Sequence, residues 1–163
     1  MNDSADSPDL NAAELRRAFG QFATGVTIVT APGPVGFTAN SFSSVSLSPP
    51  LVQWSVDLSS ERHDIFAHAK YFSIHIIDTT QRDLAEHFAR VGEGFGSCDW
   101  RIGAYDIPQI KGCLARFDCR QYAVHPAGDH SLIIGEVLNA EVGNASDEGL
   151  IFYQSRYGAF TPL

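Results

Sequence analysis

The chain has 163 residues, of which 44% are hydrophobic, and a formal net charge of −8. This length and composition are typical of one folded domain and exclude wholesale disorder. The negative charge, with Lys70 and Lys111 as the only lysines, excludes binding to a nucleic-acid backbone. No apolar run approaches the ~20 residues that a membrane-spanning helix needs, so we expect no membrane partner.

The N-terminus and the cysteines predict a cytoplasmic protein. Residues 1–10 are acidic and polar, unlike a secretory signal, and predict a disordered arm before a single domain at residues 11–163. Cys98, Cys113 and Cys119 form no C-x-x-C pair. An odd number of cysteines without a signal predicts a reducing compartment, with these side chains buried as apolar residues. The Asn144 sequon then has no role.

A helix and a β-hairpin are predicted first along the chain. Asn11 and Glu14 form a capping-box pattern at the start of a helix. Residues 26–30 are β-branched and predict a strand, with residues 35–39 returning as its hairpin partner. Residues 51–56 follow a double proline and predict a strand with Leu, Gln and Ser on one side.

The second half alternates short helices with strands. Residues 62–69 predict a short helix and residues 72–77 a strand. Thr80 and Asp83 form a second capping-box pattern, which predicts a helix there. Residues 92–103 are glycine-rich and predict a long loop. Further strands are predicted at residues 113–124, 131–142 and 150–153.

About seven strands with two or three short helices do not form the alternation of a parallel α/β fold. Mostly sequential strands predict an antiparallel barrel or a sandwich, and the pattern alone does not separate the two.

Several classes of site are excluded. No G-K-[ST] sequence is present, so the chain has no phosphate-binding P-loop. The glycines at residues 92–96 follow a predicted helix rather than a strand, which disfavours a dinucleotide fingerprint. His63 and His68 lie about 140° apart around a helix and cannot share a metal, so we expect no metal site.

Two polar motifs stand out. Residues 36–48 concentrate threonine, asparagine and serine before Pro49-Pro50, and Gly128-Asp129-His130 precedes a later apolar run. The pair, in this order, resembles the short-chain flavin reductase family, whose members share an FMN-binding split-barrel domain. The resemblance covers about residues 12–160. It implies a mainly β, Greek-key antiparallel barrel with two or three short helices.

The resemblance implies that the first motif runs beside the isoalloxazine ring of a flavin. A flavin offers carbonyls and an N–H at its pyrimidine edge, and donors aimed there favour its reduced form. An Asn/Ser-rich hairpin turn without a ligand is the alternative. The implied cofactor-binding residues are Thr38, Ala39, Asn40 and Ser41, with Ser44, Val45 and Ser46 close by.

A serine-containing loop follows the strand at residues 51–56. A strand end, two hydroxyls and a helix N-terminus predict an anion site made of unpaired N–H groups. The resemblance implies that this loop, Asp57, Leu58, Ser59, Ser60 and Arg62, receives the flavin phosphate. Arg62 stands where a threonine is expected and could bind the phosphate in bidentate fashion. An ordinary N-cap is compatible with the same residues.

The second helix ends at Phe88, Ala89 and Arg90. The resemblance places these residues along the ribityl or phosphate chain of the flavin, with Arg90 as a charge partner. An arginine in the last turn of a helix is also favourable against the helix dipole alone.

The resemblance places Gly128, Asp129 and His130 near the flavin, where His130 positions the nicotinamide. Tyr157 and Gly158 are similar to the C-terminal segment that lines the same place. Without its context, a single histidine at a strand start is more often structural. No side chain is expected to be an obligatory nucleophile or base, because orientation supplies most of the rate.

The resemblance implies an NAD(P)H:flavin oxidoreductase that transfers hydride from NADH or NADPH to FMN or FAD. The resemblance implies a homodimer that supplies reduced flavin to a separate flavin-dependent monooxygenase. Two alternatives remain open at this point. One is an electron-transfer flavoprotein of the same fold that holds its flavin tightly, and the other is a non-catalytic flavin- or tetrapyrrole-binding barrel.

Overall fold

The computed structural model describes residues 11–143 and 148–163. The predicted arm at residues 1–10 and the Asn144 sequon lie outside these ranges. Within them, no helix combines the length and the apolar character needed to cross a membrane.

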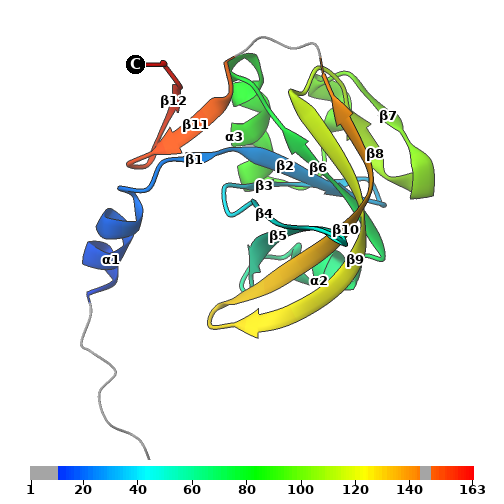
Figure 1. Cartoon of the computed structure of the whole chain (residues 1–163), viewed down its shortest axis with the longest axis horizontal. Helices are drawn as coiled ribbons and strands as arrows, with labels where there is room; N and C mark the ends of the chain where they lie inside the picture. Colours follow the sequence, from blue (N-terminus) through cyan, green and yellow to red (C-terminus); the bar gives the residue numbers. More distant parts are fainter. Residues whose placement is uncertain (1–10, 144–147) are drawn as a thin grey trace, which may run out of the picture.

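Seven antiparallel strands form the main sheet, in the spatial order β3-β2-β6-β9-β10-β5-β4. Their bounds are β2 Thr27–Ala31, β3 Val35–Ala39, β4 Ser43–Leu47, β5 Pro50–Asp57, β6 Tyr71–Ile76, β9 Ala115–Ala127 and β10 His130–Val142. The sheet curls around a common interior, with β3 and β4 as its two edge strands (Figure 1). Neighbours in the sheet are often distant in the chain, as in a Greek key. The predicted mainly β split barrel is therefore confirmed.

Trp54 of β5 lies at the centre of the barrel and is fully buried. Its ring contacts those of Phe37, Phe66 and Phe72 at centroid distances of 5.7, 5.2 and 6.1 Å. Alternate residues of β5 face this core, as the sequence predicted. Because these large rings pack against Trp54 on the core-facing side of β5, they hold in place the strand that ends at Asp57.

Two helices pack against the barrel. Helix α2, His63–His68, places Phe66 in the interior. Helix α3, Arg82–Arg90, buries Leu84, Ala85 and Phe88 in a second apolar cluster outside it. Gly36 of β3 lies so close to α3 that a Cβ atom there would stand 2.5 Å from the Phe88 ring.

The capping box before α3 differs from the prediction. Asp78, rather than Thr80, is the cap: its carboxylate accepts hydrogen bonds from the main-chain N–H and the hydroxyl of Thr80. Gln81 completes the box, and a single 3₁₀ turn, Thr79–Gln81, precedes α3. A carboxylate is a stronger acceptor than a hydroxyl, and its charge is favourable at a helix N-terminus.

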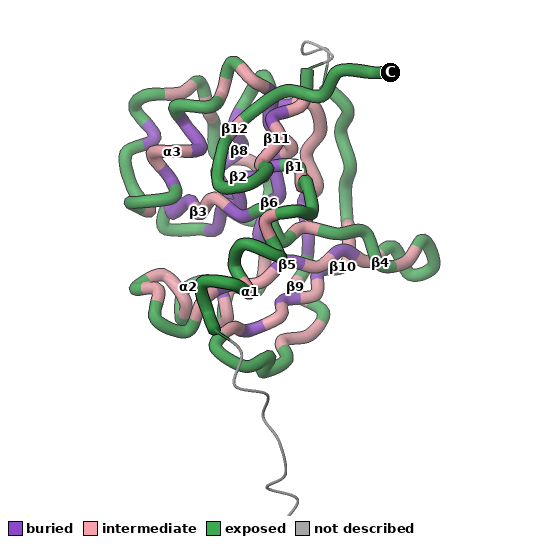
Figure 2. The backbone as a smooth tube through the Cα atoms, turned by 90° about the vertical axis from the view of Figure 1, so that its left-hand side faces the viewer, coloured by how far each residue is buried: buried purple, intermediate pink, exposed green. Residues whose placement is uncertain are grey.

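Helix α1, Ala12–Phe19, stands away from the barrel and buries none of its residues (Figures 1 and 2). Asn11 caps it by accepting from the N–H of Ala13. Its C-terminal end bonds to the turn of a separate sheet, where the N–H of Gln154 donates to the Gly20 carbonyl. That sheet has the order β1-β11-β12, with β1 Thr24–Gly25, β11 Leu150–Tyr153 and β12 Arg156–Ala159.

The loop predicted at residues 92–103 contains regular structure. It includes a 3₁₀ turn, Phe95–Ser97, and strand β7, Trp100–Ile102, which pairs with β8, Pro108–Ile110. Three-residue strands are too short to show an alternating pattern, so the sequence did not predict them. Among the predicted buried cysteines, Cys113 and Cys119 are buried, and burial raises their thiol pKa values to about 11 and about 12.

Candidate functional site

The segment from the end of β3 to the start of β4 contains residues used by the fold and residues accessible to a ligand. The Thr38 hydroxyl donates to the Ala85 carbonyl of α3 at 2.6 Å, and Ala39 is buried. Asn40 and Ser41 are exposed. The Ser41 hydroxyl accepts from the main-chain N–H of Ser55 at 2.9 Å, which attaches this segment to β5. Side-chain binding at the flavin edge is therefore expected from Asn40, whereas Thr38, Ala39 and Ser41 hold the backbone in place.

Strand β4 continues this polar surface. Ser44 is exposed, Ser46 is half-buried, and Val45 is 48% exposed between them. The Ser46 hydroxyl accepts from the N–H of Ser48 at 3.2 Å. An exposed amide and several hydroxyls at the split of a barrel fit the carbonyls and N–H of a flavin, so this donor set is compatible with the cofactor.

The loop after β5 satisfies its own donors. The Asp57 carboxylate accepts from both the N–H and the hydroxyl of Ser59, each at 2.7 Å. These bonds lower the pKa of Asp57 below its ordinary value. The N–H groups of Leu58, Ser60, Arg62 and His63 are also bonded within the protein. The prediction of an anion site built from unpaired N–H groups is therefore wrong for these five groups, which are bonded within the loop or to the β9–β10 turn. The Ser59 and Ser60 side chains remain on the surface of the loop.

The Arg62 guanidinium forms its hydrogen bonds with main-chain carbonyls of the protein itself. Its Nη1 donates to the carbonyls of Gly36, Phe88 and Val91 at 2.9, 2.6 and 3.2 Å. The guanidinium carbon also lies 4.7 Å from the centroid of the Phe37 ring. Burial lowers the pKa of Arg62. Arg62 thus joins β3, α2 and the C-terminus of α3, and the prediction that it holds a phosphate is not supported.

The end of α3 is only partly available to a ligand. Phe88 is fully buried against Gly36, so its predicted contact with the cofactor is wrong. Ala89 and Arg90 are exposed. Arg90 lines a hollow of about 490 Å³ together with Pro32, Arg62, Glu61 and Glu93. Of the three predicted residues, Ala89 and Arg90 remain accessible, and Arg90 shares its hollow with the acidic Glu61 and Glu93.

The Gly128-Asp129-His130 motif forms the turn between β9 and β10. Gly128 adopts φ +65°, a conformation that favours glycine. His130 pairs across the sheet with Asp57, and the Leu58 N–H donates to the Asp129 carbonyl at 2.9 Å. The two predicted loops are therefore neighbours, although about 70 residues separate them in the chain.

The His130 ring is partly exposed, with 41% of its side chain accessible. Its Nδ1 lies 2.7 Å from the Asp129 carboxylate. A carboxylate can only accept, so Nδ1 carries the proton, and Nε2 of the neutral ring is an acceptor that faces away from this contact. The arrangement presents one ring nitrogen to a ligand.

Tyr157 and Gly158 lie elsewhere. Figure 1 shows β12 at the top of the molecule and the β9–β10 turn at the bottom. Tyr157 pairs with Phe152, and the Arg82 guanidinium lies 5.7 Å from its ring centroid. Burial raises the pKa of its phenol. Within one chain, the prediction that these residues line the same place as His130 is therefore wrong; they border a separate hollow of about 710 Å³.

The sequence analysis did not identify His63 as part of this region. Its Nε2 lies 2.9 Å from the hydroxyl of Ser131, the residue after His130. The only signal in the sequence was its position directly after the serine loop. Among residues 11–143 and 148–163, no group of three or more metal-ligating side chains could hold a metal ion.

A split barrel with an exposed Asn/Ser edge beside a Gly-Asp-His turn defines a flavin-binding class of protein. The family profile of the flavin reductase like domain matches residues 19–161. The chain therefore belongs to the flavin reductase-like family.

Known relatives are similar in sequence to nearly the whole of this chain. It is 47% identical to the FMN reductase (NADH) SmoA of Agrobacterium fabrum, over 93% of this chain and 87% of that protein. It is 44% identical to the reductase component of a flavin-dependent trigonelline monooxygenase of Acinetobacter baylyi, over 91% of this chain and 48% of that protein. The solved structure of the NADH:FAD oxidoreductase SgcE6 of Streptomyces globisporus is 37% identical, with a TM-score of 0.88, covering 99% and 95% of the two chains.

Proposed function

We propose that this flavin reductase uses NADH to reduce freely exchanging FMN or FAD, and that the reduced flavin serves a separate monooxygenase. One observation carries the proposal: β5 joins all three predicted ligand segments. Its Ser55 is bonded to Ser41, its Asp57 pairs with His130, and the serine loop begins where it ends. The relatives named above include an NADH-dependent FMN reductase and a reductase component of a monooxygenase.

Each segment has a role in binding. Asn40 donates to the pyrimidine edge of the flavin, with Ser41, Ser44, Val45 and Ser46 beside it. Ser59, Ser60 and Arg90 face the ribityl-phosphate side, and Gly128, Asp129 and His130 receive the nicotinamide. When bound, the flavin supplies the two-electron acceptor. The residues of the chain only orient the two reactants, and that orientation supplies most of the rate.

The activity is tested by the near-ultraviolet absorbance decay of NADH, then NADPH, with purified protein and added FMN or FAD under air. Decay that requires both protein and free flavin supports the proposal. A yellow preparation that survives dialysis would favour the alternative of a tightly bound flavin. No decay with any of the four pairings, from folded protein, would favour a non-catalytic flavin-binding barrel.

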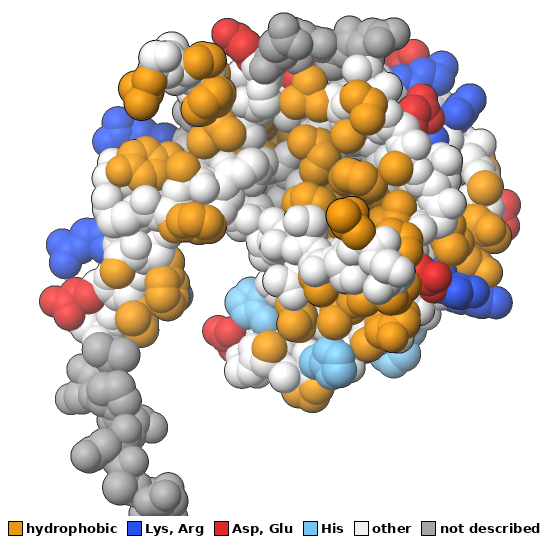
Figure 3. Space-filling model, viewed as in Figure 1, with side chains coloured by type: hydrophobic (Ala, Val, Ile, Leu, Met, Phe, Trp, Pro, Cys, Tyr) orange, Lys and Arg blue, Asp and Glu red, His pale blue; other side chains and the backbone are white. Residues whose placement is uncertain are grey.

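We also propose a cytoplasmic homodimer built from a single domain at residues 11–163. Helix α1 buries nothing, and Phe19, Phe22 and Leu47 are 70%, 79% and 96% exposed. Apolar side chains gather over the centre of the face in Figure 3. Exposed apolar surface of this kind is typical of an interface. The three free cysteines suit the reducing cytoplasm. Light scattering after size exclusion should give twice the 17.7 kDa chain mass.

A further inference from the structure

The side chains of His63 and Ser131 meet between α2 and β10. His63 is the first residue of α2, and only 16% of its side chain is exposed. Its Nε2 lies 2.9 Å from the hydroxyl of Ser131, which is itself 7% exposed. The other ring nitrogen, Nδ1, lies 2.9 Å from the Asp64 carboxylate. Both ring nitrogens of this largely buried histidine therefore have a hydrogen-bond partner.

The Asp64 contact determines how the hydrogen bond is made. A carboxylate only accepts, so Nδ1 carries a proton and Nε2 of the neutral ring accepts from the Ser131 hydroxyl. If the ring becomes charged, Nε2–H donates to the same hydroxyl, because a hydroxyl can act in either sense. The contact between His63 and Ser131 therefore persists in both charge states of the histidine.

The contact between His63 and Ser131 is one of three that attach the serine loop to the β9–β10 turn and the start of β10. The serine loop is held at its start by the pairing of Asp57 with His130 and by the Leu58 N–H on the Asp129 carbonyl. It is held at its end by His63 on Ser131. Successive side chains of a strand point to opposite faces, so Ser131 faces inward while His130 faces the ligand side.

We propose that His63 is a positioning residue that, through Ser131, holds the serine loop against the turn that carries His130. The inference rests on the proposed function, in which the loop faces the flavin and the turn faces the nicotinamide. Loss of the contact frees the end of the loop from β10 and disturbs both surfaces together. Binding of both ligands therefore weakens, unlike a change at His130, which affects the nicotinamide alone.

The test compares five variants, one of them a control, by their KM for NADH and their Kd for FMN from fluorescence titration. His63→Ala and Ser131→Ala should each raise both constants about fivefold, the effect of one hydrogen bond. The double variant should be no worse than either single one, because both remove the same contact. His63→Gln should stay within about twofold of wild type, since its amide can reach the same hydroxyl.

His68→Ala is the matched control. His68 is on the same helix and bonds only the Asp64 carbonyl among the described residues, so both constants should be unchanged.

Unchanged constants in His63→Ala, or effects that multiply in the double variant, would overturn the inference. If His63→Ala does not fold, unchanged constants in Ser131→Ala overturn it equally. A purely structural role would lower the melting temperature without changing either constant. If the wild type oxidises no NADH with any flavin, the proposed function fails instead, and the FMN titrations still test the contact.

Discussion

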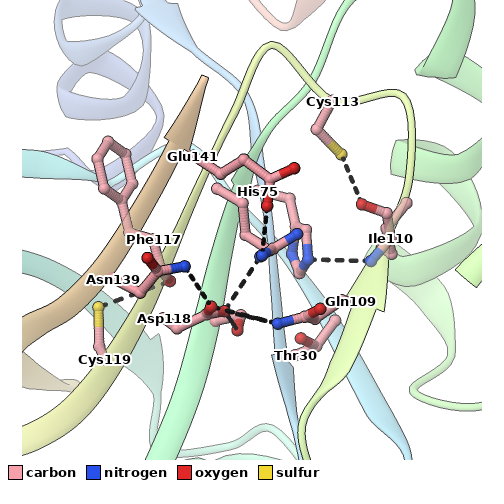
Figure 4. Close-up of polar contacts among 12 residues, drawn as sticks. Thr30, His75, Gln109, Ile110, Cys113, Phe117, Asp118, Cys119, Asn139 and Glu141 are labelled. Carbon is pink, nitrogen blue, oxygen red and sulfur yellow. Dashed lines mark hydrogen bonds and ion pairs between the residues drawn. The ribbon is translucent and has the colours of Figure 1, made fainter. Parts of the chain in front are cut away.

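His75 should make the stability of this protein sensitive to mild acid. It lies on β6 and is fully buried, within the polar group shown in Figure 4. Its Nδ1–H donates to the Ile28 carbonyl at 2.9 Å, and its Nε2 accepts from the Ile110 N–H at 3.1 Å. Only the neutral ring satisfies both partners, because a second N–H would face the N–H of Ile110. Burial therefore lowers the pKa of His75 to about 4.

The size of the effect follows from proton linkage. The unfolded chain binds this proton with a pKa of about 6.5, whereas the folded protein resists it down to about 4. Between these values the unfolded state holds more protons, so stability falls as the pH falls. From pH 7.5 to pH 5 the two pKa values correspond to a loss of about 2 kcal/mol in the free energy of unfolding. That is a large fraction of the stability of a typical domain.

Urea unfolding of the wild type and of His75→Gln at pH 7.5 and pH 5 measures this loss. The glutamine amide can donate to one partner and accept from the other without titrating, so the variant should lack the His75 contribution. Asp118 does not interfere: burial raises its pKa, but hydrogen bonds from Ser73, Asn139 and Arg116 outweigh this and hold it below 3.8. Equal losses in both proteins, within about 0.5 kcal/mol, would refute the reasoning.

Four further substitutions test the site and its support. His130→Ala should raise the KM for NADH several-fold with FMN affinity nearly intact; equal losses in both would contradict its role at the nicotinamide. Asn40→Ala should weaken FMN binding about fivefold by titration, and normal affinity would remove it from the ring edge. Gly36→Ala should lower the free energy of unfolding by about 1–3 kcal/mol, because the new methyl group overlaps the Phe88 ring; an unchanged urea midpoint would contradict that packing. Arg62→Ala should lower the free energy of unfolding by about 2 kcal/mol while the folded protein still binds FMN, and a selective loss of FMN affinity would restore its phosphate role.

The longer strands, their burial pattern and the ligand motifs could be predicted from the amino-acid sequence alone. Alternating β-branched and aromatic residues predicted the strand at residues 51–56, because a strand buries every second side chain. The Gly128-Asp129-His130 motif was recognised from its residues alone, whereas the turn that it forms became known from the structure. Short elements were less predictable. The residues of β4 were predicted only as part of a ligand-binding segment, and β7 and β8 were not predicted as strands. Their few residues carry no periodicity.

Which residues of each motif remain accessible to a ligand could be established only from the contacts of the folded chain. Arg62 and Phe88 stand in ligand motifs, yet one is bonded to carbonyls and the other is buried under Gly36. His63, which no motif included, contacts Ser131 beside the site. A side chain's role depends on the partners that folding brings within hydrogen-bond distance, and those partners lie 26 to 68 residues away in the chain. Local patterns record residue type and period but not these contacts.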